Sequence, residues 1–196
     1  MEFTIRPAEV PDALAVAEVH VAGWQWGYRD VLPADLLSNL DATERAERLL
    51  AILADPERTA SVRLAESEGA VVGFVSSGPT RDPDAPEVIS GGGGTGGAGA
   101  TGADGPGGAG GTGEVYALYV AEAAAGTGVG PALLGTAVAD LGDRGFRHAT
   151  LWVLDSNARA RRFYEREGWR PDGATKSENF RGHVLSEVRS ERTPDD

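Results

Sequence analysis

Residues 114–131 read EVYALYVAEAAAGTGVGP, and residues 151–169 read LWVLDSNARARRFYEREGW. In the first stretch, strand-forming residues up to Val120 are followed by a glycine-rich turn and by an amphipathic helix over 131–141. In the second, an apolar run over 149–154 predicts a buried strand, and the helix after it ends before Gly168, a residue typical of helix ends. This alternation of strands and helices predicts a mixed α/β fold around a central sheet.

The flanking sequence adds further strands and helices. Two apolar segments, 61–65 and 71–77, joined through Glu68-Gly69, predict a hairpin. Hydrophobic periodicity predicts the remaining elements, which are a first strand over 3–6, helices over 12–21, 33–40 and 43–53, and a last strand over 183–189. The predicted order is strand, helices, hairpin, strand, helix, strand, helix, strand.

The glycine-rich segment 91–113 has almost no side chains that a core would bury. Ordering it would cost chain entropy without an apolar gain, so we expect it to be disordered. The predicted organisation is a single domain over 1–190, a disordered Gly-rich insertion at 81–113 and a flexible tail at 191–196.

Composition and charge exclude several classes of function. The chain has 196 residues, a formal net charge of −12 from 18 basic and 30 acidic residues, and no cysteine. Disulfides, thiolate metal sites and a cysteine nucleophile are therefore excluded. A nucleic-acid partner is not expected, because phosphates require clustered basic residues. No apolar run is long enough for a membrane span, and residues 1–6 do not resemble a secretory signal, so we expect no membrane partner and a cytoplasmic location.

The turn over 125–131 has the composition of a phosphate-binding loop. Its glycines let a ligand approach the backbone, and the helix that follows presents unpaired N–H groups and a positive dipole end. The ligand class stays open between a nucleotide, a dinucleotide and coenzyme A, and a tight turn without a ligand fits as well. The dinucleotide fingerprint lacks its first glycine, because Ala124 stands there, and no Lys-Ser/Thr follows as in a nucleotide triphosphate loop.

The helix over 157–167 carries two polar side chains on one face. Asn157 and Tyr164 are seven residues apart, about two helical turns, with the small Ala160 between them. This face offers room for a linear ligand, an amide to hold an amide-rich chain and a phenol beside a leaving group. The structural alternatives are that Asn157 caps the helix and that Tyr164 packs on the sheet.

Together these stretches resemble the GNAT superfamily of acetyl-CoA-dependent N-acetyltransferases. The resemblance covers nearly the whole chain except 91–113, and the segments 5–8 and 26–33 are similar to one bacterial branch. It implies an N-acetyltransferase domain with a mostly antiparallel, twisted sheet of about six to seven strands flanked by helices. It also implies acetyl-CoA as co-substrate and a small-molecule or peptide amine as acceptor.

The resemblance also implies a role for each site residue. Tyr164 is expected to protonate the departing thiolate, and Glu114 is our candidate for the base that deprotonates the amine. A solvated strand end is the alternative for Glu114. The expected coenzyme-binding residues are Leu118, Tyr119 and Val120 for the pantetheine amides, Gly126, Thr127, Gly128, Val129 and Gly130 for the pyrophosphate, and Asn157.

The chain departs from the family pattern in the turn. The family usually has Gln or Arg at the position of Ala125 and often a basic residue at the positions of Thr127 and Pro131, and all three are uncharged here. Pro131 also lacks an N–H. Arg159 and Arg162, in the helix over 157–167, are candidates to replace part of the missing charge.

Two functions remain open on the sequence alone. The first is an enzyme that acetylates a primary amine by direct attack, favoured by Tyr164, Asn157 and Glu114. The alternative is a non-catalytic acyl-CoA binding or sensing module, favoured by the uncharged turn. A homodimer is left open beside a monomer.

Other residues with functional chemistry carry weaker signals. The aromatic side chains Trp24, Trp26 and Tyr28 are candidates for an acceptor pocket, and core packing explains them equally well. No metal is expected, because the histidines have no metal-ligand spacing.

Overall fold

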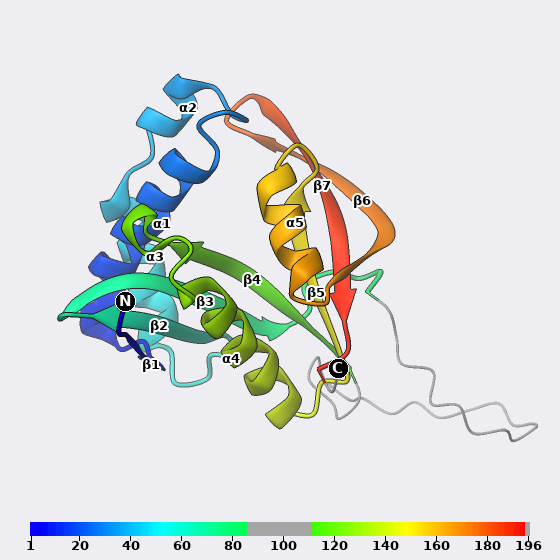
Figure 1. Ribbon diagram of the computed structural model, residues 1–196, viewed down its shortest axis with the longest axis horizontal. Coiled ribbons are helices and arrows are strands. Elements are labelled where there is room, and N and C mark those ends of the chain that lie inside the picture. Colours follow the sequence, from blue (N-terminus) through cyan, green and yellow to red (C-terminus); the bar gives the residue numbers. More distant parts are fainter. Residues whose placement is uncertain (86–110, 195–196) are drawn as a thin grey trace, which may run out of the picture.

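The computed structural model describes residues 1–85 and 111–194. A seven-stranded sheet runs through these residues in the order β1-β2-β3-β4-β5-β7-β6 (Figure 1). All neighbouring strands are antiparallel except β4 and β5, which are parallel. The strands are β1 Thr4–Pro7, β2 Ser61–Ser67, β3 Ala70–Pro79, β4 Thr112–Val120, β5 His148–Leu154, β6 Arg170–Phe180 and β7 His183–Arg192. The predicted fold class, a mixed fold with a mostly antiparallel sheet, is confirmed.

Helices cover both faces of this sheet. Alternation along β2 separates the two faces, because Leu64 packs in one apolar cluster with α1 and α3 while its neighbour Ala65 packs in another with α4. Helices α4 and α5 lie on one side of the sheet in Figure 1, and α1 and α3 lie on the other. The helices are α1 Ala13–Gly27, α2 Ala34–Ser38, α3 Ala42–Ala54, α4 Val129–Asp143 and α5 Ala158–Arg166, with short 3-10 turns η1 Val10–Asp12 and η2 Glu122–Ala124.

The apolar face of α4 forms the centre of one core cluster. Leu133, Leu134 and Leu141 recur at helical spacing and are almost completely buried against β2, β3 and β4. Trp169, directly after α5, is buried in the same cluster. This packing fixes α4, and with it the turn at its start, against the middle of the sheet.

The predicted hairpin over 61–77 is confirmed. Glu68 and Gly69 have φ angles of 51° and 79°, so both turn residues lie in the left-handed region that a two-residue hairpin turn requires. The structure also contains a strand that hydrophobic periodicity missed. Strand β6 is an edge strand with mostly exposed, polar side chains, so it has no apolar alternation to detect.

The expected insertion at 81–113 and the expected tail at 191–196 both include residues that are part of the folded structure. Residues 81–85 are described and anchored, since Arg81 binds Glu114 and Asp82 binds Arg189. Strand β4 begins at Thr112, and Gly113 packs so closely under α4 that an added Cβ would lie 2.6 Å from the side chain of Leu141. Strand β7 likewise continues through Arg192. The expected disorder of 86–110 lies outside the described residues.

Leu133→Ala should lower the free energy of unfolding by about 3–5 kcal/mol, because Leu133 is fully buried and its removal leaves a cavity. Gly135→Ala, two residues further along α4, should raise it by about 0.5–1 kcal/mol, because nothing lies within 4 Å of the added Cβ. Denaturant melts measure both changes. Equal stability of the two variants would contradict the assignment of these faces of α4.

Candidate functional site

Strands β4 and β5 separate part-way along their length. Their last paired residues are Val115 and Leu151, although β4 continues to Val120 and β5 to Leu154. Beyond Val115, the edge of β4 that faces β5 therefore carries backbone N–H and C=O groups without a strand partner. An extended ligand can add to such an edge by main-chain hydrogen bonds.

A bulge marks the point of separation. On the other side of β4, Ser77 pairs with Val115 and Ser76 pairs with Ala117, so Tyr116 is an additional residue in β4. A bulge bends its strand and increases the local twist. Strand β4 therefore bends away from β5 at the position where their pairing ends.

The turn between η2 and α4 presents unpaired backbone donors. Gly126 and Gly128 have φ angles of 77° and 94°, which glycine adopts readily and other residues rarely do. Within the described chain, no hydrogen bond is recorded for the N–H groups of Gly126, Gly128, Val129 and Gly130. These donors stand at the positive end of α4, which favours an anion.

Helix α5 presents Asn157 and Tyr164 to the space between β4 and β5. The Oδ1 atom of Asn157 accepts a hydrogen bond of 3.0 Å from the N–H of Ala160, so Asn157 is the helix cap that the sequence allowed. The ring of Tyr164 packs edge-on against Phe163 and Trp169. Its hydroxyl has no hydrogen-bond partner among the described residues, so it is free to donate to a ligand.

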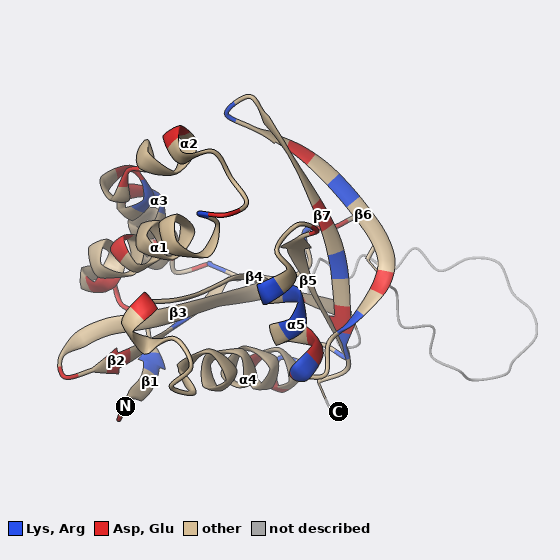
Figure 2. Cartoon of the chain, turned by 45° about the horizontal axis from the view of Figure 1, so that its top comes forward, with Lys and Arg blue, Asp and Glu red and all other residues tan. Residues whose placement is uncertain are grey.

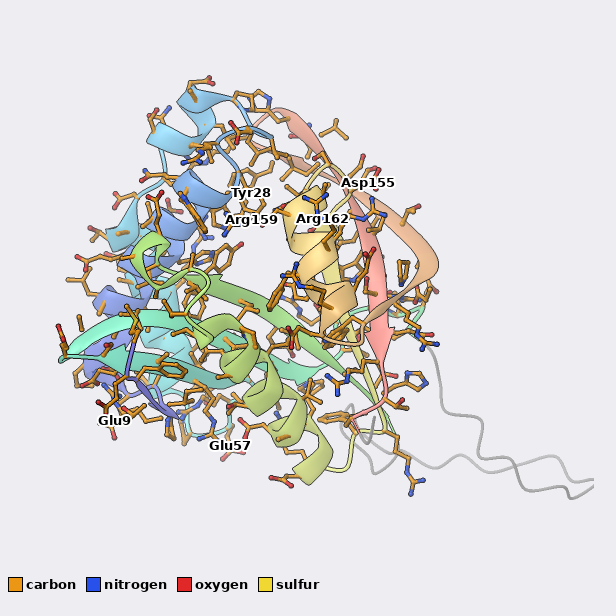
Figure 3. The ribbon with its side chains drawn as sticks, in the orientation of Figure 1. Glu9, Tyr28, Glu57, Asp155, Arg159 and Arg162 are labelled. Atoms are coloured by element: carbon orange, nitrogen blue, oxygen red, sulfur yellow. The ribbon has the colours of Figure 1, made fainter. Side chains whose placement is uncertain are left out.

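These elements surround one cavity of about 850 Å³. Its wall comes from α1, β4, the glycine-rich turn, β5, α5 and β7, and Figure 3 labels Tyr28, Arg159 and Arg162 around it. The sequence-predicted site residues that line it are Leu118, Tyr119, Val120, Gly126, Gly128, Gly130, Asn157 and Tyr164. A cavity of this volume is typical of a small-molecule or cofactor site.

Aromatic and acidic side chains line a further part of the cavity. Trp24 and Trp26 contribute from α1, Tyr28 contributes from the residue that follows α1, and Leu185 and Glu187 contribute from β7. Trp24 and Tyr28 also pack in an apolar cluster with α2, so they line the cavity and contribute to core packing as well.

The phenols in the cavity are held in their protonated form. Burial raises the pKa of Tyr28, Tyr119 and Tyr164, and the neighbouring Tyr28 raises the pKa of Tyr164 further. The hydroxyls of Tyr28 and Tyr119 lie 3.5 Å apart. Each phenol is therefore a proton donor at neutral pH.

His20 is a neutral base in the wall of the same cavity. Burial, and then the positive charge of Arg45, lower its pKa to about 3. The indole N–H of Trp24 donates to its Nε2 atom at 3.0 Å. His20 therefore holds Trp24 in place and carries no charge at physiological pH.

The side chains of three predicted site residues have partners outside the cavity. The carboxylate of Glu114 is buried and accepts hydrogen bonds from the backbone N–H and the guanidinium of Arg81, at 2.9 and 2.6 Å. The hydroxyl of Thr127 donates to the carbonyl of Ala124, and the side chain of Val129 is buried in the core. None of the three is among the residues that line the cavity.

Glu187 is the carboxylate that sequence reasoning missed. It lines the cavity from β7, is paired with Lys176 at 3.3 Å and raises the pKa of Tyr28 through its charge. In the sequence it was one polar residue of an alternating strand, and only the sheet order brings that strand beside β5.

The described parts of the chain contain no group of three or more His, Asp or Glu side chains arranged to hold a metal ion. Nor does any helix in them have the length and apolar character needed to cross a bilayer.

Comparison with known proteins decides the family. The model of the acetyltransferase (GNAT) family matches residues 24–169, which include β4, the turn, α4, β5 and α5. The chain belongs to this family. A relative from Bacillus subtilis, described as the uncharacterized N-acetyltransferase YuaI, is 28% identical over 79% of this chain and 73% of its own length. A mycothiol acetyltransferase of Parafrankia is 47% identical over 64 residues, which are 33% of this chain and 20% of that protein.

Solved GNAT structures share the fold. The PaiA N-acetyltransferase of Thermoplasma acidophilum, in complex with coenzyme A, has a TM-score of 0.65 at 17% identity and covers 98% of this chain and 99% of its own. YncA of Salmonella typhimurium, a putative acetyltransferase with acetyl-CoA, has a TM-score of 0.63 at 20% identity, with coverage of 100% and 96%.

His20 should make stability sensitive to acid. It stays neutral in the folded chain down to about pH 3 and is protonated below about pH 6.5 when unfolded. Between these values the unfolded state binds more protons, so the free energy of unfolding falls as the pH is lowered. Thermal melts at about pH 7 and about pH 5 should therefore show that the wild type loses more stability on acidification than His20→Gln does. Equal losses of stability in the two proteins would rule out a buried, neutral His20.

Proposed function

We propose that this GNAT protein transfers the acetyl group of acetyl-CoA to the primary amine of a small-molecule or peptide acceptor. One observation carries the proposal: the unpaired edge of β4, the donor-rich turn and the unbonded hydroxyl of Tyr164 face one cavity. The names of the relatives support acetyl transfer. We also propose that the enzyme consists of one domain, acts in the cytoplasm and needs no metal.

The groups that line the cavity are complementary to those of the coenzyme. The backbone groups of 118–120 would pair with the amides of the pantetheine arm, as a further strand would. The N–H groups of the turn would bind the pyrophosphate at the start of α4. The thioester would then lie between β4 and β5, near Tyr164.

Tyr164 would act as the general acid. The acceptor nitrogen attacks the thioester carbonyl, a C–N bond forms, the C–S bond breaks, and the phenol donates its proton to the departing sulfur. Burial raises the pKa of Tyr164, so its hydroxyl carries its proton at physiological pH and is available to the departing sulfur.

Glu187 would take the proton of the amine. Its carboxylate lines the cavity beside Tyr28, whereas that of Glu114 is bound to Arg81 outside it. A carboxylate there also attracts a protonated amine before it reacts, and the net charge of −12 acts in the same direction. We therefore propose Glu187 in place of Glu114 as the base.

The uncharged turn favours the alternative function, an acyl-CoA binding or sensing module without turnover. Ala125 and Pro131 line the cavity where the family usually has polar or basic residues. Turnover with a panel of amines separates the two functions, because a sensor would bind acetyl-CoA without releasing free thiol.

Tyr164→Phe should lower kcat by about 10²–10⁴-fold and leave the Kd for acetyl-CoA nearly unchanged, because only the transferable proton is removed. Thiol release and calorimetry give the two quantities. Unchanged kcat would contradict the acid role, and a large change in Kd would assign Tyr164 to binding.

Glu187→Gln should lower kcat at least about 10²-fold with retained acetyl-CoA binding. Glu191→Gln is the matched control, since it removes the same charge from β7 at a residue outside the cavity. A comparable loss in the control would contradict the proposal. If Glu114→Gln folds and loses kcat while Glu187→Gln keeps it, Glu114 is the base instead.

A further inference from the structure

Helix α5 has a face of arginines that points into the cavity. Arg159, Arg162 and Arg166 are spaced by three and four residues, which places them on one face of the helix, and all three line the cavity. Among the described residues, none of them forms an ion pair with a carboxylate. Arg161 on the same helix is instead paired with Asp155 at 2.6 Å.

Unpaired arginines are unexpected in so acidic a chain. With 30 acidic against 18 basic residues, carboxylate partners are abundant, yet no carboxylate in the described part of the chain forms an ion pair with this face of α5. Basic residues mark α5 in blue in Figure 2. Burial, and then the charge of Arg29, lower the pKa of Arg159, and the charge of Glu122 opposes them to a smaller extent. Such a cluster favours a bound anion.

The arginine face adjoins the glycine-rich turn. A Cβ added to Gly130 would lie 3.6 Å from the ring of Phe163, so α5 packs directly against the first turn of α4. Arg162 precedes Phe163, and Arg166 follows it by one helical turn. The stretch of α5 that carries Arg162 and Arg166 therefore lies beside the turn, and both line the same cavity.

Arg159 is held in position from the other side of the cavity. Its guanidinium lies over the ring of Trp26 in α1, 3.6 Å from the ring centroid. A cation–π contact of this kind orders the side chain and leaves the edge of the guanidinium free for hydrogen bonds.

We propose that Arg159, Arg162 and Arg166 bind the phosphate groups of the coenzyme and supply the positive charge that the turn lacks at Ala125, Thr127 and Pro131. The inference rests on the proposed function, in which the coenzyme is acetyl-CoA. Planar guanidinium groups bind phosphate oxygens through paired, charge-assisted hydrogen bonds. Coenzyme binding in this chain therefore depends on α5 for charge and on the turn for backbone donors.

Calorimetric titration with coenzyme A tests the proposal on the full chain. Arg162→Gln should weaken binding by about tenfold, and the variant with all three arginines replaced by glutamine by about a hundredfold or more, because charge-assisted hydrogen bonds are lost. Arg161→Gln is the matched control. It lies on the same helix and lowers the net charge by the same amount as Arg162→Gln, so it should bind coenzyme A like the wild type.

Two further ligands separate phosphate contacts from damage to the fold. Dephospho-coenzyme A lacks the 3′-phosphate. If the arginine substitutions weaken the binding of this ligand less than that of coenzyme A, the arginines bind the 3′-phosphate. If they weaken the binding of both ligands equally, the arginines bind the pyrophosphate. S-acetylpantetheine has no nucleotide, so its kcat/KM should be the same in the wild type and in Arg162→Gln.

Equal affinities of the wild type and the triple variant for coenzyme A would overturn the inference and leave the proposed function intact. An equal loss in Arg161→Gln would also overturn it, because long-range charge would then explain the effect. A wild type that binds neither coenzyme A nor acetyl-CoA would overturn the proposed function together with the inference.

Discussion

The early end of the pairing between β4 and β5 is the constraint on which the site depends. The two strands are parallel neighbours only as far as Val115 and Leu151, and the bulge at Tyr116 turns β4 away. Unpaired backbone groups inside a protein are costly unless water or a ligand satisfies them. The gap is held open because α4 is fixed by its buried leucines on one face and α1 packs on the other. A ligand with its own amide groups is the chemical complement of this edge.

The cavity is lined by groups of both charges. Arginines of α5 and the donors of the glycine-rich turn contribute positive charge, and Glu187, which is paired with Lys176, contributes a carboxylate from β7. The phenols of Tyr28, Tyr119 and Tyr164 in the same cavity stay protonated because burial disfavours the phenolate. In the proposed function, the positive groups would bind the anionic coenzyme, and the carboxylate and the net charge of −12 would attract a cationic amine.

Sequence patterns predicted those parts of the structure in which local chemistry and the fold agree. The leucines of α4 and the Glu68-Gly69 turn each have one physical reading, and the structure contains the corresponding elements. The spacing of Asn157 and Tyr164 allowed a structural and a ligand-binding reading, and in the structure both residues line the cavity while Asn157 also caps α5. Strand β6 was missed because its polar side chains carry no burial signal. Gly113 was assigned to the insertion because composition cannot distinguish a flexible glycine from one packed under Leu141. Glu187 was missed because only the sheet order brings β7 to the cavity.

Amide hydrogen exchange with and without acetyl-CoA is the most direct test of the central claim, that the free edge of β4 and the turn bind the coenzyme. The expected result is slower exchange in peptides that cover 116–120 and 126–130, since their unpaired N–H groups would become hydrogen-bonded to the ligand. The edge strand β6, which lies outside the cavity, should exchange at the same rate in both samples. Tight binding of acetyl-CoA without protection in 116–120 would contradict the account.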